Sequence, residues 1–100
     1  MTPCTMKILA IEKELKPVDW SKFQQILKDE ANRVYELYQY DYIREIYFNE
    51  NNQAVLILEC ENKEHAAELL NTLPLAESKL IAFDLTELRP YSGYSRLMNI

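Results

Sequence analysis

The spacing of apolar residues changes along the chain, and each change predicts a new element. A spacing near two over residues 7–14 predicts a strand, which Pro17 ends because proline cannot donate to a sheet ladder. Apolar residues then recur every three or four positions to about residue 39, which predicts a helix that Asp19 or Ser21 can cap. The apolar face of this helix comprises Trp20, Phe23, Leu27, Ala31, Val34, Leu37 and Tyr38.

The pattern then predicts a hairpin and a second helix. Residues 42–48 are aromatic and β-branched, the Asn-Glu-Asn-Asn segment forms a turn, and residues 54–60 supply the second strand of the hairpin. Asn62 is a good cap for a helix over residues 63–73. We expect Pro74 to end that helix, because proline lacks the amide that the helical ladder needs.

With a last strand over residues 79–88, the order is strand, helix, strand, strand, helix, strand. Right-handed crossovers fold this order into an antiparallel four-stranded sheet with both helices on one face, which is an α+β fold of the ferredoxin-like βαββαβ type. The segments Ala-Val-Leu-Ile-Leu and Leu-Ile-Ala-Phe are apolar on both sides, although the helices cover only one side. We therefore expect a homodimer in which a second copy covers the open face.

Composition and charge narrow the class of protein. A chain of 100 residues buries a single core, and we expect a leader over residues 1–5, a folded domain over 6–91 and a tail over 92–100. A net charge of -5 without a Lys/Arg stripe argues against nucleic acid as a partner. The apolar runs are far shorter than the roughly 20 residues of a membrane helix, and the N-terminus lacks a signal-peptide pattern. We expect a soluble cytoplasmic protein that does not bind membranes.

Cysteine, histidine and glycine offer little chemistry. Cys4 and Cys60 have no CxxC spacing, so we interpret both as free thiols. His65 is the single histidine, which excludes a multi-histidine metal site within one chain. Gly93 is the single glycine, and no glycine-rich phosphate loop is present. The sequence therefore predicts neither a metal nor a cofactor.

The segment LNTLPLAESKLIAFDLTELRPY resembles the C-terminal half of the muconolactone isomerase family. The resemblance continues upstream of this segment, where four residues align with the first helix and second strand of that family. They are Asp29, Glu30, Leu37 and Arg44. The resemblance implies a dimeric α+β barrel and a cofactor-free, isomerase-like bacterial protein that moves a proton in a small lactone or enol acid. The chain departs from the family in Ile-Arg-Glu-Ile-Tyr-Phe, residues 43–48, where the histidine and the second arginine of the family are missing.

Two charged residues interrupt predicted apolar faces. On a helical wheel Glu30 falls between Phe23 and Leu37, so it faces the sheet, where desolvation raises the pKa of a carboxyl toward the range of a general acid/base. Arg44 shares its predicted strand face with Tyr42, Ile46 and Phe48, and its guanidinium can hold a substrate carboxylate in two hydrogen bonds. We expect the two side chains to approach each other beneath the helix, either as acid/base and anion anchor or as a structural ion pair.

Aromatic residues complete the predicted pocket. We expect Tyr38, Tyr42 and Phe23 to line it, and Arg89 to stand at its rim or at the dimer interface. Two other functions remain open, because a fold hosts many activities. One is a non-catalytic dimeric module that binds a small ligand or supports assembly. The other is a cofactor-independent monooxygenase, an activity that also occurs on dimeric α+β barrels.

Overall fold

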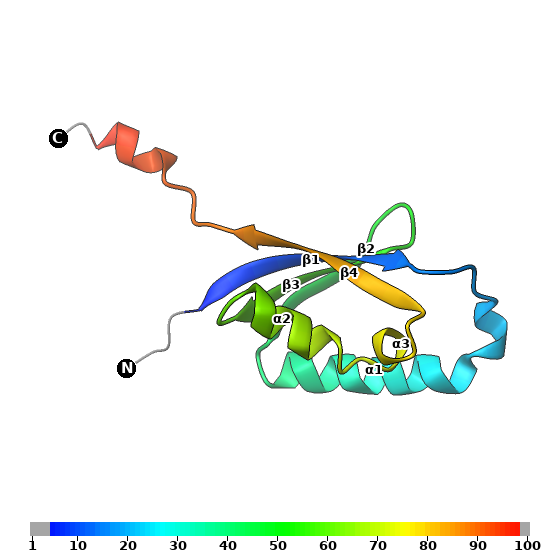
Figure 1. The fold of residues 1–100 in the computed structure, drawn as a ribbon. Helices are drawn as coiled ribbons and strands as arrows, with labels where there is room; N and C mark the ends of the chain where they lie inside the picture. Colours follow the sequence, from blue (N-terminus) through cyan, green and yellow to red (C-terminus); the bar gives the residue numbers. More distant parts are fainter. Residues whose placement is uncertain (1–4, 99–100) are drawn as a thin grey trace.

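The computed structural model describes residues 5–98 of the chain, so most of the predicted leader lies outside the described residues. One sheet carries the helices on a single face (Figure 1). No helix of the described part is long and apolar enough to cross a membrane. In chain order the elements are β1 Met6–Glu14, the 3₁₀ helix η1 Trp20–Lys22, α1 Gln24–Gln39, β2 Ile43–Phe48, β3 Ala54–Cys60, α2 Lys63–Leu70, α3 Pro74–Glu77, β4 Ile81–Leu88 and the 3₁₀ helix η2 Gly93–Leu97.

The sheet has the strand order β2-β3-β1-β4, and every neighbouring pair is antiparallel. Strand β1 lies inside the sheet, because it pairs with β3 on one side and with β4 on the other. This order and the helices on one face confirm the predicted ferredoxin-like α+β fold.

Alternation along β1 and β3 divides their apolar residues between the two faces of the sheet. The residues buried beneath the helices are Ile8, Ala10, Leu56 and Leu58. The residues between them, paired across the two strands on the opposite face, are Leu9, Ile11, Val55 and Ile57. Within residues 5–98 no helix covers this second face (Figure 1), so this part of the chain leaves an apolar centre on it.

Pro74 does not end the second helix, which corrects the expectation from the sequence. Helix α2 ends at Leu70, and Pro74 is the first residue of the short helix α3. Proline is favoured there because its fixed φ suits a helix start and because the first amide needs no partner. Leu73 and Leu75 on either side are only 1% and 5% exposed, so the Leu-Pro-Leu segment closes the core at the turn.

The last strand begins at Ile81, two residues later than the apolar pattern suggested. Lys79 has a φ of 58°, in the left-handed region, which is incompatible with a strand. The amide of Leu80 then donates to the carbonyl of Leu75 over 3.0 Å, which ends α3 with a closed turn. Strand β4 can therefore begin only after this turn.

Beyond β4 the chain leaves the domain. We call residues 89–98 the C-terminal arm; it projects away from the sheet and ends in η2 (Figure 1). The arm accounts for the elongated outline of the molecule, whose principal extents are 61 × 33 × 19 Å.

Candidate functional site

A cleft opens between α1 and the sheet, on the side of the edge strand β2. Its volume is about 1240 Å³. The sheet contributes Glu12, Ile46 and Phe48 to its lining. The longer wall comes from α1 and comprises Leu27, Glu30, Ala31, Val34, Tyr35 and Tyr38. Trp20 lies at the end where α1 begins.

Apolar side chains on both walls of the cleft remain exposed. Phe48 on the sheet wall is 76% exposed, and Tyr35 on the helix wall is 60% exposed. Ile46 stands opposite the buried Leu56 of β3, which places this side of β2 on the face that carries the helices. An apolar surface that lines a cleft and stays uncovered is typical of a binding site.

Glu30 is a carboxylate held inside this cleft. Its Oε1 accepts a hydrogen bond of 3.0 Å from the amide of Leu75, in the first turn of α3. Burial raises the pKa of Glu30, because desolvation disfavours the charged carboxylate; the hydrogen bond from Leu75 lowers it, and the negative charge of Glu12 raises it further. Glu30 therefore holds its proton more tightly than an exposed glutamate, and this is the direction of shift that favours a general acid/base.

Glu12 is a second carboxylate of the cleft, and the sequence analysis missed it. The ladder between β1 and β3 ends at the pair Ile11 and Val55. Beyond that pair, the Oε1 atom of Glu12 accepts a hydrogen bond of 2.9 Å from the amide of Ala54, which replaces the next ladder contact. The alternation of side chains along β1 could have indicated this position, because Glu12 follows the buried Ile8 and Ala10 at the same spacing of two residues.

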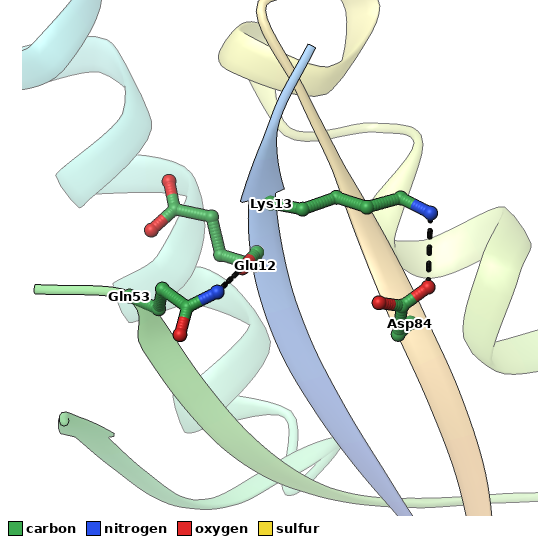
Figure 2. A network of polar contacts seen from close by, with 4 residues as sticks. All are labelled: Glu12, Lys13, Gln53 and Asp84. Carbon is green, nitrogen blue, oxygen red and sulfur yellow. Dashed lines mark hydrogen bonds and ion pairs between the residues drawn. The ribbon is translucent and has the colours of Figure 1, made fainter. Parts of the chain in front are cut away.

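Figure 2 shows that neighbouring side chains of β1 leave the strand on opposite faces. The carboxylate of Glu12 points toward α1, and the side chain of Gln53 donates to the backbone oxygen of Glu12 over 2.9 Å. Lys13 points the other way and pairs with Asp84 of β4 at 2.9 Å. The basic side chain is therefore on the open face of the sheet and the acidic one is in the cleft.

The charge of the cleft is negative. Glu12, Glu14 and Glu30 belong to its lining, and the lining residues in the described part of the chain include no Lys, Arg or His. Glu14 also accepts a hydrogen bond of 3.1 Å from the indole Nε1 of Trp20. Within residues 5–98, no group of three or more His, Cys, Asp or Glu side chains is placed to hold a metal ion.

Arg44 does not lie in the cleft, so its expected approach to Glu30 is wrong. Strand β2 has a shift of register between Ile43 and Glu45, which inserts Arg44 as an extra residue. The simple alternation assumed for this strand therefore fails at this position. The Nε atom of Arg44 lies 3.6 Å from an oxygen of Glu59, on the face of the sheet that no helix covers.

Of the aromatic residues predicted for the pocket, Tyr38 lines the cleft and Tyr42 does not. Tyr42 precedes β2 and packs edge to face against His65 of α2, with ring centroids 5.4 Å apart. This contact turns Tyr42 toward the second helix and away from the cleft. The prediction that Tyr42 lines the same pocket as Glu30 is therefore wrong.

Phe23 and Arg89 also lie outside the cleft lining. Phe23 packs edge to face against Trp20, with centroids 6.4 Å apart. It also packs against the second core cluster, which consists of the buried residues Leu75, Leu80 and Ile81. Arg89 is exposed on the C-terminal arm, and its Nε atom lies 3.8 Å from Glu87. Phe23 is therefore a core residue, and Arg89 cannot form the rim of the cleft within its own chain.

Comparison with known proteins gives no assignment: no protein-family model matches the chain, and no curated protein matches it. The interpretation of the cleft therefore depends on the chemistry of its own residues.

The raised pKa of Glu30 predicts how stability changes with pH. The folded protein holds the proton of the Glu30 carboxyl more tightly than the unfolded chain does. The contribution of Glu30 to the free energy of unfolding therefore falls as the pH rises from the ordinary pKa of a carboxyl through the raised pKa of Glu30. Gln at this position is neutral at every pH and can still accept from the Leu75 amide. We expect Glu30→Gln to melt at a higher temperature than the parent at about pH 7, with no gain at about pH 3.

The measurement is a melting curve at each pH by circular dichroism. Glu68→Gln, on an exposed position of α2, is the matched control and is expected to show no such difference between the two pH values. A Glu30→Gln variant with the same stability change at both pH values would contradict the desolvated carboxyl.

Proposed function

We propose that this protein binds a small, mainly apolar or aromatic molecule in the cleft between α1 and the sheet. The observation that supports this proposal is the exposed aromatic lining, with Tyr35 and Tyr38 on one wall and Phe48 on the other. A ligand between these walls would remove apolar surface from water, at roughly 25 cal/mol per Å². The few polar groups of the lining would then fix the orientation of the ligand.

A second candidate function, isomerase-like proton transfer, is favoured by the position and raised pKa of Glu30. In this reaction the carboxylate of Glu30 removes a proton beside a lactone or enol carbonyl and returns it to another carbon. The hydroxyl groups of Tyr35 and Tyr38 are donors that the cleft lining offers to a carbonyl oxygen, as are the side-chain amides of Asn51 and Asn52. The resemblance to muconolactone isomerases suggested the same type of reaction.

The charge of the cleft changes the expected class of ligand. Arg44 lies on the other face, and a ligand carboxylate would meet Glu12 and Glu30 with no basic group in the described lining. Two negative groups in a partly buried site repel a third. A neutral lactone or ketone is therefore a better ligand than the corresponding acid.

A binding screen tests the proposal. Neutral lactones, aromatic ketones and their matched carboxylic acids are titrated into the protein, with the melting temperature and the fluorescence of Trp20 as signals. We expect neutral ligands to bind and the acids to bind more weakly. If no neutral ligand raises the melting temperature or changes the fluorescence, the binding proposal is wrong.

Two exposed aromatic residues provide a matched pair of variants for this screen. Phe48→Ser removes an aromatic wall of the cleft, whereas Tyr40→Ser removes an exposed aromatic at the end of α1 that is not part of the lining. We expect only Phe48→Ser to weaken binding. For a ligand that is turned over, Glu30→Gln is expected to keep binding and to lose at least about 100-fold in rate. An unchanged rate would remove the proton-transfer role.

We also propose a homodimer built through the open face of the sheet. The support is the apolar centre formed by Leu9, Ile11, Val55 and Ile57, which no helix covers. The resemblance to dimeric α+β barrels led to the same expectation. A cytoplasmic location stays a prediction from the sequence.

A further inference from the structure

The C-terminal arm carries an apolar surface that its own domain does not cover. Its four large apolar side chains are between 66% and 78% exposed: Tyr91, Tyr94, Leu97 and Met98. The arm nevertheless has local order, since Tyr91 packs edge to face against Tyr94 with centroids 4.8 Å apart. The ring of Tyr91 also lies so close to Gly93 that a Cβ there would clash with it. The arm therefore presents a shaped aromatic surface to solvent.

The arm leaves the sheet near the start of β1, whereas the residues of β1 that line the cleft are near the end of that strand. Leu88, the last residue of β4, pairs with Lys7 near the start of β1. Glu12 and Glu14, which line the cleft, lie at the other end of β1. Five residue steps between Lys7 and Glu12 correspond to roughly 17 Å of strand. The arm continues away from the sheet at this end (Figure 1), so it is directed away from the cleft of its own chain.

The arm and the cleft have complementary charge and complementary apolar surface. Residues 89–98 include Arg89 and Arg96 and no Asp or Glu. The cleft lining includes three glutamates, and the described lining residues include no basic side chain. Each surface also exposes aromatic side chains that lack a cover. Opposite charge at the rim of an apolar contact guides two such surfaces together.

We propose that in the homodimer each C-terminal arm crosses to the second copy and lies over the cleft of that copy. Tyr91 and Tyr94 contact the aromatic walls, and the arginines of the arm lie near the cleft glutamates. The cleft volume of about 1240 Å³ exceeds the roughly 300–1,000 Å³ of common small-molecule pockets, which leaves room for both a ligand and the arm. This inference rests on the proposed function and adds to it, because the second copy then supplies the lid of the binding site.

Trp20 allows a direct test, because it is the single tryptophan of the chain and lines the cleft. Indole emission moves to shorter wavelength when water leaves its surroundings. The full chain is compared with an arm variant that carries Tyr91→Ser, Tyr94→Ser and Leu97→Ser. We expect the emission of the full chain to move to shorter wavelength as the concentration rises through the dimerisation range. The arm variant is expected to show no such shift.

Mixing two variants shows whether the arm acts between copies. A Trp20→Phe chain has an intact arm and no fluorescent reporter, whereas the arm variant has the reporter and a defective arm. We expect the mixture to recover the emission shift of Trp20, because the dark chain supplies its arm to the fluorescent one. A Trp20→Phe chain that also carries Arg89→Glu and Arg96→Glu is expected to need at least a tenfold higher concentration to produce the same emission shift.

Two results would overturn the inference. One is a mixture that leaves the emission of Trp20 unchanged. The other is a full chain whose emission differs from that of the arm variant by the same amount at every concentration, which indicates an arm folded back on its own chain. Titration of a neutral lactone into the arm variant reports separately on the proposed function. If the lactone binds but the Trp20→Phe chain does not change the emission of Trp20, the proposed lid is wrong and the proposed binding function stands.

Discussion

Replacing Leu73 by aspartate is expected to lower the melting temperature by about 20 °C or to prevent folding. Leu73 is 1% exposed and belongs to the same buried cluster as Ile8 and Leu56 of the sheet. Truncating such a leucine costs about 2–5 kcal/mol, and aspartate adds the cost of a buried polar group. Aspartate would also cap α3, since Leu73 is the residue before this helix, but a cap contributes only about 1 kcal/mol. The loss of packing therefore outweighs the new cap.

Thermal unfolding followed by circular dichroism measures this effect. Leu73→Met, which keeps the volume and the apolar character, is the matched control and is expected to cost less than about 1.5 kcal/mol. Leu75→Asp is expected to be similarly severe, because Leu75 is 5% exposed within the second core cluster. A Leu73→Asp protein with an unchanged melting temperature would contradict the buried Leu-Pro-Leu turn.

The fold could be predicted from the sequence because burial on one face produces a period that survives in the amino-acid pattern. Strand β3 was placed correctly at both ends, since its β-branched and apolar run is flanked by turn residues. Asn62 was recognised as a helix cap, and its side chain accepts from the amide of His65 over 2.7 Å. These signals are local, so a single sequence contains them.

The position of Arg44 could not be predicted in the same way. The residues around it all suit a strand, and no local signal marks the extra residue between Ile43 and Glu45. A bulge is determined by how two strands pair, and one extra residue moves a side chain to the other face. The predicted acid/base and anion-anchor pair failed for this reason, although Glu30 lies in the cleft.

Pro74 and Glu12 show two further limits of the sequence pattern. Proline both ends a helix and begins one, so Pro74 could be placed only once the end of α2 at Leu70 was known. Glu12 stands in the charged segment Glu-Lys-Glu, which is typical of an exposed strand end. Its place in the cleft became clear only when α1 was seen to leave that part of the sheet open.

Substituting Ile57 by lysine is expected to dissociate the proposed homodimer. Ile57 lies opposite Leu9 of β1 and Glu45 of β2, on the sheet face that no helix covers. A two-fold interface would contain the substitution twice. The cross-strand neighbour Glu45 could pair with each ammonium group, but burying both charges costs more than their attraction returns. We expect the dimer dissociation constant to rise at least about 100-fold, or about 3 kcal/mol. In the monomer the lysine can reach water, so the melting temperature of the single chain should change little.

Sedimentation velocity over a range of micromolar concentrations measures this change. Gln39→Lys is the control: it adds the same charge at an exposed position at the end of α1, on the helix side of the sheet. We expect it to leave the dimer intact. A parent protein that sediments as a monomer at these concentrations contradicts the dimer itself. A dimer that survives Ile57→Lys but dissociates in the arm variant contradicts the sheet interface alone. The exchanged arms would then be the contact that holds the two copies together, because the arm variant removes apolar side chains of the arm and leaves the open face of the sheet unchanged.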